Sequence, residues 1–182
     1  MDAYYVGNQI YNLLTFVIYG YGNAVQILLG KRLGAGEIIE AQKESNYHIG
    51  LAGVISIFLV SFLLIFGKPM ISLFGLESEI SKTLAVGIVY VLALKASMRL
   101  YNYMIFCILR SGGDSKIITI LDSGLQWAIG IPLAFISVNI LNLTSITLVL
   151  LVTQTEQLIR VILGMIRVKS YRWANNLTKV VG

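Results

Sequence analysis

Long apolar stretches, separated by short polar or glycine-containing connections, dominate the hydropathy pattern of the chain. Each stretch is close to the length of about 20 residues that an α-helix needs to cross a bilayer. Five such segments lie at residues 5–29, 48–66, 80–109, 117–138 and 146–168. None shows the strict alternation over about ten residues that is typical of membrane β-strands. The pattern therefore predicts an all-α integral membrane protein with five transmembrane helices.

The longest connection between these segments lies at residues 31–47. Its charged residues between positions 37 and 44 alternate with apolar ones, which predicts a short amphipathic helix at the membrane interface. His48 then begins the second segment and is expected at a solvated helix end. Trp127 and Trp173 lie near segment ends, where tryptophan usually anchors a helix at the interface, although Trp127 is also a candidate for the interior.

Basic residues are concentrated on one side of the predicted helices. The net charge is +5, only 13% of the residues are charged and the mean hydropathy is +0.79, whereas soluble domains contain about 25% charged residues. Lys and Arg lie mainly in segments 31–43, 110–116 and 167–179, which share one side. The positive-inside rule places that side in the cytoplasm. We therefore expect a multi-pass plasma-membrane protein with a cytoplasmic C-terminal tail (169–182), an external N-terminus, a missing upstream segment and no nucleic-acid partner.

Polar residues inside the predicted spans indicate where function resides. A charge near the middle of a bilayer costs at least about 2.5 kcal/mol, so such residues usually face a bundle interior or an aqueous cavity. In each span they recur at helical spacing and share one face. The candidates for binding a substrate or a coupling ion are Lys95, Arg99, Asn102, Asp122, Gln126, Glu156 and Arg160; the candidates for lining a cavity are Asn8, Asn12, Tyr19, Asn23, Tyr103 and Trp127.

The distribution of these polar faces predicts an arrangement of the helices. Every predicted span except 48–66 has a polar face, so the other spans are expected to surround a common interior while 48–66 packs outside, largely against lipid. The interior would contain one more cation than carboxylates. This excess implies a carboxylate on another helix, an anionic ligand or a deprotonated lysine. A purely structural network of interhelical ion pairs and hydrogen bonds is the alternative interpretation.

The sequence contains no pattern that indicates an enzyme or a resident metal. No nucleophile lies beside a base, and no His, Cys, Asp and Glu residues show metal-ligand spacing. Cys107 is the only cysteine, which excludes an intramolecular disulfide. We therefore expect no cofactor other than a coupling ion.

Four motifs, in order along the chain, resemble those of one transporter family. They are Gly-Lys-Arg-Leu-Gly-Ala-Gly at 30–36, Leu-Arg-Ser-Gly-Gly-Asp-Ser-Lys at 109–116, Trp-Ala-Ile-Gly-Ile-Pro-Leu at 127–133, and Ser-Tyr-Arg-Trp at 170–173. In the MATE (multidrug and toxic compound extrusion) family, similar segments follow the eighth helix, follow the tenth, lie in the eleventh and follow the twelfth. The resemblance covers nearly the whole chain.

The resemblance implies a fold of twelve helices in two lobes, of which residues 1–182 would form a partial C-terminal lobe with helices eight to twelve. The first lobe would then be missing or supplied by a partner chain. It also implies a secondary antiporter that exports drugs or other organic, often cationic, compounds in exchange for Na⁺ or H⁺. Lys95 and Arg99 occupy the face where some members carry a carboxylate. They favour an alternative, a flippase for lipid-linked saccharides, and a truncated non-transporting fragment is a further one.

Overall fold

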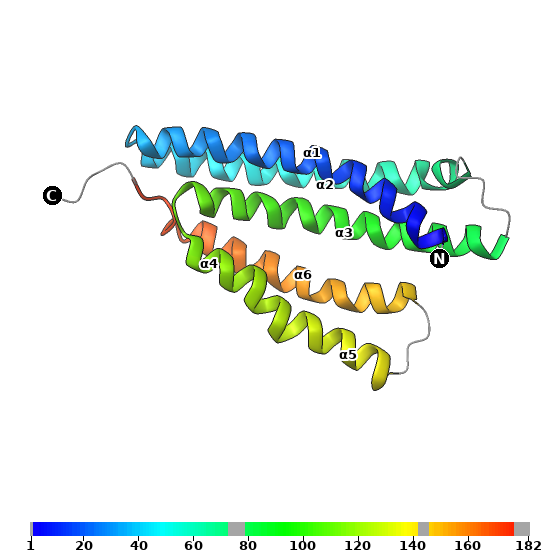
Figure 1. The fold of residues 1–182 in the computed structure, drawn as a ribbon. Helices are drawn as coiled ribbons and strands as arrows, with labels where there is room; N and C mark the ends of the chain where they lie inside the picture. The colour runs from blue at the N-terminus through cyan, green and yellow to red at the C-terminus, as the bar shows by residue number, and fades with distance from the viewer. Residues whose placement is uncertain (1, 73–78, 142–145, 177–182) are drawn as a thin grey trace.

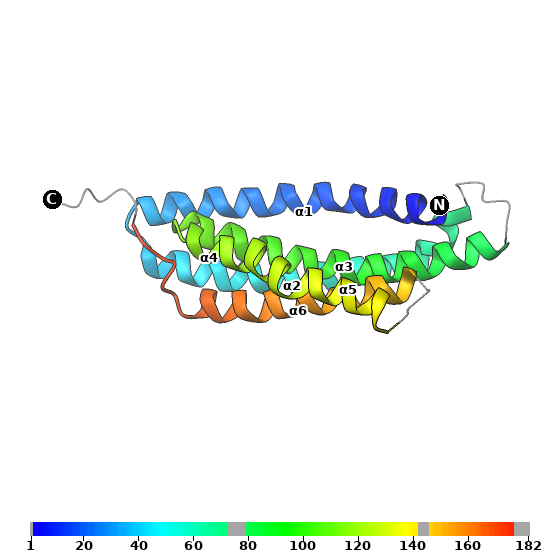
Figure 2. The ribbon, with the colours of Figure 1, turned by 60° about the horizontal axis from the view of Figure 1, so that its bottom comes forward.

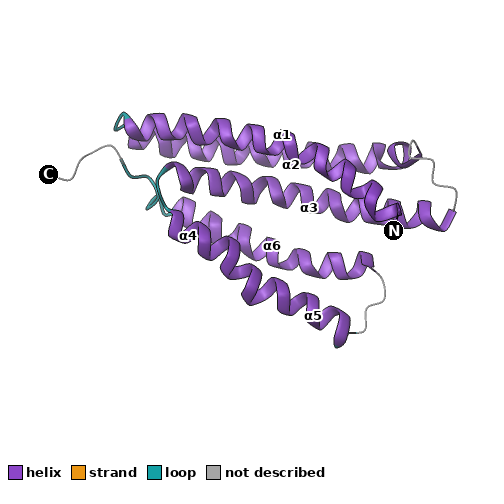
Figure 3. Cartoon of the chain, viewed as in Figure 1, coloured by secondary structure: helices purple, strands orange, loops and turns teal. Residues whose placement is uncertain are grey.

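The computed structural model describes residues 2–72, 79–141 and 146–176, and these residues form a bundle of long helices (Figures 1 and 3). The helices are α1 (Asp2–Gly34), α2 (Ile38–Ser72), α3 (Glu79–Ser111), α4 (Ser115–Thr119), the π-helical turns η1 (Ile120–Gly124) and η2 (Gln126–Gly130), α5 (Ile131–Asn139) and α6 (Ile146–Lys169). No strand occurs within the described ranges. The predicted all-α fold is therefore confirmed.

The central element is α3, which packs against α1, α2 and α6. The view turned by 60° shows the helices α1 and α6 on different sides of α3 (Figure 2). Elements α4, η1, η2 and α5 follow one another without a break and form a single rod that packs along α6. Pro132 lies in the first turn of α5 and has no backbone N–H to donate, so an uninterrupted ladder of α-helical hydrogen bonds is not possible at this point. The adjoining π-helical turns are typical of such an irregularity.

Among the residues that the structure describes, three helical stretches are long and apolar enough to cross a membrane: Ile38–Pro69, Ala85–Ser111 and Ser115–Asn139. The first of these presents a row of large apolar side chains outward, among them Ile57, Phe58 and Ile65, and 67% of Phe58 is exposed. An apolar surface of this kind suits a lipid environment. The expectation that the second predicted span packs at the outside is consistent with this exposed face.

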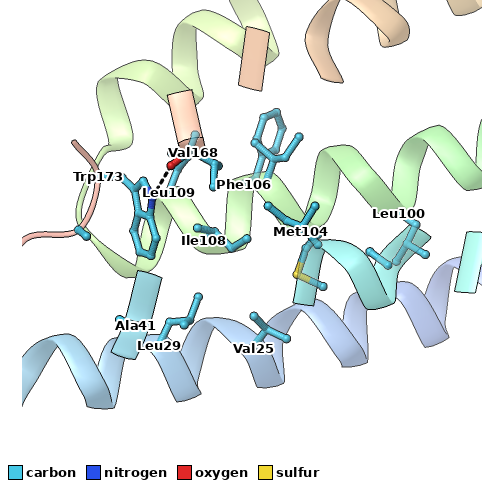
Figure 4. Close-up of a cluster of buried hydrophobic side chains, with 14 of the residues drawn as sticks. Val25, Leu29, Ala41, Leu100, Met104, Phe106, Ile108, Leu109, Val168 and Trp173 are labelled. Carbon is cyan, nitrogen blue, oxygen red and sulfur yellow. Dashed lines mark hydrogen bonds between the residues drawn. The ribbon is translucent and has the colours of Figure 1, made fainter. Parts of the chain in front are cut away.

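The main apolar core lies where α1, α2, α3 and the end of α6 meet (Figure 4). Leu29, Leu109, Val168 and Trp173 are all fully buried there. The indole Nε1 of Trp173 donates a hydrogen bond to the backbone carbonyl of Val168 at 3.0 Å. The prediction that Trp173 is an interfacial anchor is wrong, because its polar nitrogen finds a partner inside the protein and its ring fills the core.

Three connections gather at one end of the bundle, at residues 31–37, 110–116 and 167–176, and we call this region the turn end (Figure 1). Gly36 and Gly113 have φ angles of 82° and 81°, which only glycine adopts without strain, and they reverse the chain direction. The three basic segments predicted to share one side therefore do lie together.

Four polar contacts connect the segments at the turn end. Arg167 donates to Asp114 at 2.7 Å, and Asn46 of α2 donates to the hydroxyl of Tyr171 at 2.7 Å. Arg32 forms ion pairs with Glu44 at 2.5 Å and Glu37 at 2.7 Å. These ion pairs tie the end of α1 to the start of α2.

Two predictions about the first connection are wrong. Residues 31–47 do not form a separate interfacial helix, because α1 continues to Gly34 and α2 already begins at Ile38. His48 consequently lies well inside α2, where its Nδ1 is 3.0 Å from the hydroxyl of Tyr21. A helix continues beyond its apolar stretch wherever its backbone hydrogen bonds can form, and charged residues on an exposed face do not stop it.

Candidate functional site

A cavity of about 700 Å³, which we call the large cavity, lies between α1, α3 and α6. Its described walls combine two cations with neutral polar and aromatic side chains. The lining residues are Gln9, Asn12, Thr15, Phe16, Tyr19, Lys95, Arg99 and Gln157. The α1 residues repeat at spacings of three and four, which places them on one face of a helix. Asn12 and Tyr19, two of the predicted lining residues, are among them.

Arg99 connects the large cavity to aromatic residues between α1 and α3. Its guanidinium donates to the hydroxyl of Tyr19 at 3.0 Å and lies 5.8 Å from the centre of the same ring. The Tyr19 and Tyr103 rings are 4.7 Å apart, and the Tyr103 hydroxyl donates to Asn23 at 2.8 Å. Gly22 makes this approach possible, because a Cβ there would lie 2.6 Å from the Tyr103 ring. These contacts fix the side of α3 that carries Arg99.

A buried amide pair joins α3 to α6. Asn102, which is almost completely buried, donates from Nδ2 to the side-chain oxygen of Gln157 at 2.7 Å. Within the described part of the chain, the Oδ1 atom of Asn102 has no hydrogen-bond partner. Buried polar atoms are usually satisfied. Asn102 therefore joins the two helices through its donor, while its acceptor atom is left unsatisfied.

A second cavity of about 320 Å³, the small cavity, lies between α3, α6 and the η2–α5 part of the rod. Its lining residues are Lys95, Gln126, Gly130, Ile131, Ala134, Thr153, Gln154, Glu156 and Gln157. Lys95 and Gln157 line both cavities. The predicted common interior is thus divided into two spaces that share these two side chains.

A charged cluster borders the small cavity and is centred on Arg160, of which only 3% is exposed. Arg160 donates twice to one carboxylate oxygen of Glu156, at 2.9 and 2.5 Å, and once to Asp122 at 2.7 Å. It also donates to the backbone carbonyl of Asp122 at 3.2 Å and to Gln126 at 3.5 Å. One guanidinium therefore connects α6 to both π-helical turns.

The cluster combines a buried carboxylate with an accessible one. Glu156 and Arg160 are one helical turn apart, with the acid on the N-terminal side, which is the favourable orientation. The side chain of Glu156 is 3% exposed and that of Asp122 is 54% exposed. Removing one member of a buried ion pair leaves an uncompensated charge at a cost of about 3–5 kcal/mol. Asp122 is therefore only partly covered by this chain, whereas Glu156 is enclosed and depends on Arg160 for compensation.

Residues 1–136 match the model of the MatE family. The chain belongs to the MATE family. It is also 28% identical over 146 residues to the uncharacterized transporter YisQ of Bacillus subtilis (strain 168). This alignment covers 75% of the chain and 31% of YisQ, so the chain spans about a third of the length of that relative. No solved structure matches it significantly. The family match and the long apolar helices show that the chain is a membrane protein of this family.

The structure of this MATE-family chain brings most of the predicted site residues together. Lys95, Arg99, Asn12 and Tyr19 line the large cavity, whereas Asp122, Gln126, Glu156 and Arg160 form the charged cluster. Asn102 is joined to a residue of both cavities. Both carboxylates of the predicted interior, Asp122 and Glu156, contact Arg160. The other two predicted cations, Lys95 and Arg99, line the large cavity.

Other predicted lining residues lie elsewhere in this MATE-family chain. Trp127 is 73% exposed and lines a pocket with Asp122, Ser123 and Gln126, and it is not among the described linings of the large and small cavities. Asn23 and Tyr103 bond to each other and are not among the described linings of the two cavities. The side chain of Asn8 lies outside the described residues.

The main site residues absent from the predicted set are neutral amides and hydroxyls. Gln9, Thr153, Gln154 and Gln157 line the cavities without carrying a charge. Gln157 matters most, since it faces both cavities and binds Asn102. Its position directly after Glu156 places it about 100° around the helix from the acid. Weighting amides as strongly as charges in the fifth segment would have identified it.

Proposed function

We propose that this MATE-family protein is a secondary active antiporter that exports organic solutes across the plasma membrane in exchange for Na⁺ or H⁺. The observation that supports this function best is the position of the charged cluster. It borders the small cavity, which shares Lys95 and Gln157 with the larger, solute-sized cavity. Ionisable groups inside membrane helices usually mark ion or substrate pathways. A protein that exchanges an ion for a solute needs an ionisable site close to a solute-binding cavity, and the charged cluster has such a position.

Asp122 and Glu156 are the proposed coupling residues. Protonation of Asp122, or Na⁺ binding to it, would weaken its ion pair with Arg160. That ion pair and the backbone contact of Arg160 hold the η1 turn to α6. A coupling ion at Asp122 would therefore loosen the rod Ser115–Asn139 from α6 at the wall of the small cavity. The ion would therefore bind more tightly when the rod is loosened from α6 than when Arg160 holds Asp122.

The proposed transporter needs more protein than this chain provides. It spans about a third of YisQ, so we propose that it acts together with another lobe on the same polypeptide or on a partner chain. Inverted or parallel repeats packed around a midplane site are the usual architecture of secondary transporters. The basic turn end then lies in the cytoplasm, as the positive-inside rule requires.

The test uses the protein expressed from its own gene, purified and reconstituted in liposomes. Efflux of a cationic and of an anionic dye is measured after Na⁺ and H⁺ gradients are imposed separately. We expect ion-driven efflux of at least one dye, and Asp122→Asn and Glu156→Gln should each reduce it by roughly tenfold or more. Glu40→Gln removes an exposed carboxylate at the start of α2 and serves as the matched control.

Several outcomes separate the possibilities. Wild-type efflux rates in both Asp122→Asn and Glu156→Gln would contradict the proposed coupling residues. Gradient-independent movement of either dye would contradict antiport. An antibody against residues 167–182 reports the mass of the native protein, and a band near 20.1 kDa without any efflux would favour a non-transporting fragment.

A flippase for lipid-linked saccharides is the second candidate, because Lys95 and Arg99 line the large cavity. A pyrophosphate carries negative charge that two cations can bind. Reconstituted protein that moves a fluorescent lipid-linked saccharide between leaflets, but no soluble dye, would favour this function. Efflux of soluble dyes without lipid movement would favour the antiporter.

A further inference from the structure

The walls of the large cavity are positively charged. Lys95 and Arg99 are the charged residues among its described lining side chains, and none of the described lining residues is acidic. The rest are amides, a threonine and two aromatic residues. A cavity inside a membrane protein concentrates the field of such charges, since the surrounding medium has a low dielectric constant.

The acidic residues near the cavities form their ion pairs outside the large cavity. Asp122 and Glu156 both bind Arg160, which is not among the described residues that line the large cavity. Glu156 lines the small cavity together with Lys95, but not the large one. Arg99 donates to Tyr19, a neutral hydroxyl. The charged groups on the described walls of the large cavity are therefore these two cations.

The apolar part of the wall is well placed to bind the body of a ligand. Phe16 and Tyr19 lie one helical turn apart on α1, and Phe16 is exposed. The volume of about 700 Å³ is within the range of small-molecule sites, roughly 300–1,000 Å³. Aromatic walls with a few fixed polar groups are typical of sites for organic ligands.

We propose that the large cavity binds an amphipathic organic anion, whose carboxylate or phosphate group lies between Lys95 and Arg99 while its apolar body packs against Phe16 and Tyr19. Guanidinium and ammonium groups both form charge-assisted hydrogen bonds with oxyanions. This inference rests on the proposed export of organic solutes and specifies the charge of the solute. A cationic solute would instead have to enter a space whose described charges repel it.

The experiment measures binding separately from transport. The protein expressed from its own gene is purified in detergent, and fluorescence anisotropy follows binding of two dyes that share a xanthene ring system. Carboxyfluorescein is anionic and rhodamine 123 is cationic. We expect carboxyfluorescein to bind more tightly than rhodamine 123, and Lys95→Gln and Arg99→Gln each to weaken its binding by roughly 10- to 100-fold.

Matched variants separate charge from folding. Lys95→Arg and Arg99→Lys keep the positive charge and should retain most of the binding. Lys116→Gln removes an exposed cation at the start of α4 and should bind carboxyfluorescein like the wild type. Competition by benzoate, phenyl phosphate and farnesyl diphosphate then shows whether a carboxylate, a soluble phosphate or a lipid diphosphate is preferred.

Each result decides a specific point. Tighter binding of rhodamine 123 by the wild-type protein, or unchanged carboxyfluorescein binding in the two Gln variants, would overturn the anion site. This comparison of dyes on the wild type does not depend on the folding of any variant. Anion binding that depends on Lys95 and Arg99 without ion-driven efflux would support the site and contradict the antiporter. Ion-driven rhodamine efflux without anion binding would do the reverse.

Discussion

The turn end and the cavity region are held together by different interactions. At the turn end, apolar side chains such as Leu109, Val168 and Trp173 are fully buried, and ion pairs lie around them. Around the cavities, the buried side chains include Glu156 and Arg160, which rely on each other for compensation. Close packing resists rearrangement, whereas ion pairs beside a cavity can exchange partners. The difference indicates that the turn end is rigid and that the contacts around the cavities can rearrange.

The largest expected effect is the loss of the turn-end core in Trp173→Ala. The change removes a fully buried ring and the hydrogen bond from its indole nitrogen to Val168. We expect a loss of roughly 3–5 kcal/mol in the free energy of unfolding, measured by denaturant titration in detergent. Trp127→Ala removes an exposed indole and provides the control. Equal losses of stability in Trp173→Ala and Trp127→Ala would contradict the conclusion that Trp173 is buried and Trp127 is exposed.

A smaller effect is expected from Gly112→Ala, which tests the close approach of the chain at the turn end. A Cβ at this position would fall on the backbone carbonyl oxygen of Trp173. Backbone shifts forced by such overpacking cost about 1–3 kcal/mol. Gly30→Ala in α1 is the matched control, because its Cβ would meet open space and alanine favours a helix. Thermal unfolding should rank the control at or above the wild type and Gly112→Ala below it.

The smallest effect is expected beside the large cavity, from Tyr103→Phe. The ring contact with Tyr19 stays, and the hydrogen bond from the hydroxyl to Asn23 is lost. One hydrogen bond contributes about 0.5–1.5 kcal/mol, so a small decrease in thermal stability is expected. Tyr47→Phe, at an exposed tyrosine of α2, controls for removal of a hydroxyl. A loss as large as that of Trp173→Ala would show that the cavity region is as tightly constrained as the turn end.

Hydropathy predicted the fold well where apolar stretches and helices coincide. The segment 80–109 corresponds to α3 (Glu79–Ser111), and 146–168 corresponds to α6 (Ile146–Lys169). The prediction failed at residues 31–47, because hydropathy detects the apolar part of a helix and not its polar continuation. Glu40 and Lys43 pair with each other on the exposed face of the α2 start, and His48 follows in the same helix.

Charge identified the ionic part of the site more readily than its neutral walls. The pairing of Glu156 with Arg160 follows from their spacing along one helix. The addition of Asp122 to that pair depends on which element lies beside α6, and spacing contains no such information. Trp173 was misplaced for a related reason. An indole near a span end satisfies the usual pattern of an interfacial anchor, while its burial depends on Gly112 from a distant part of the chain.

The shared position of Lys95 between the two cavities has a thermodynamic consequence. If the proposed solute binds in one cavity and the proposed coupling ion in the other, movement of the Lys95 ammonium toward the solute changes the electrostatic potential at the ion. Whatever factor the first ligand applies to the affinity of the second, the second must apply to the first. Titrating either site at fixed occupancy of the other would therefore yield a single interaction free energy, the same from both directions, and Lys95→Gln should reduce it.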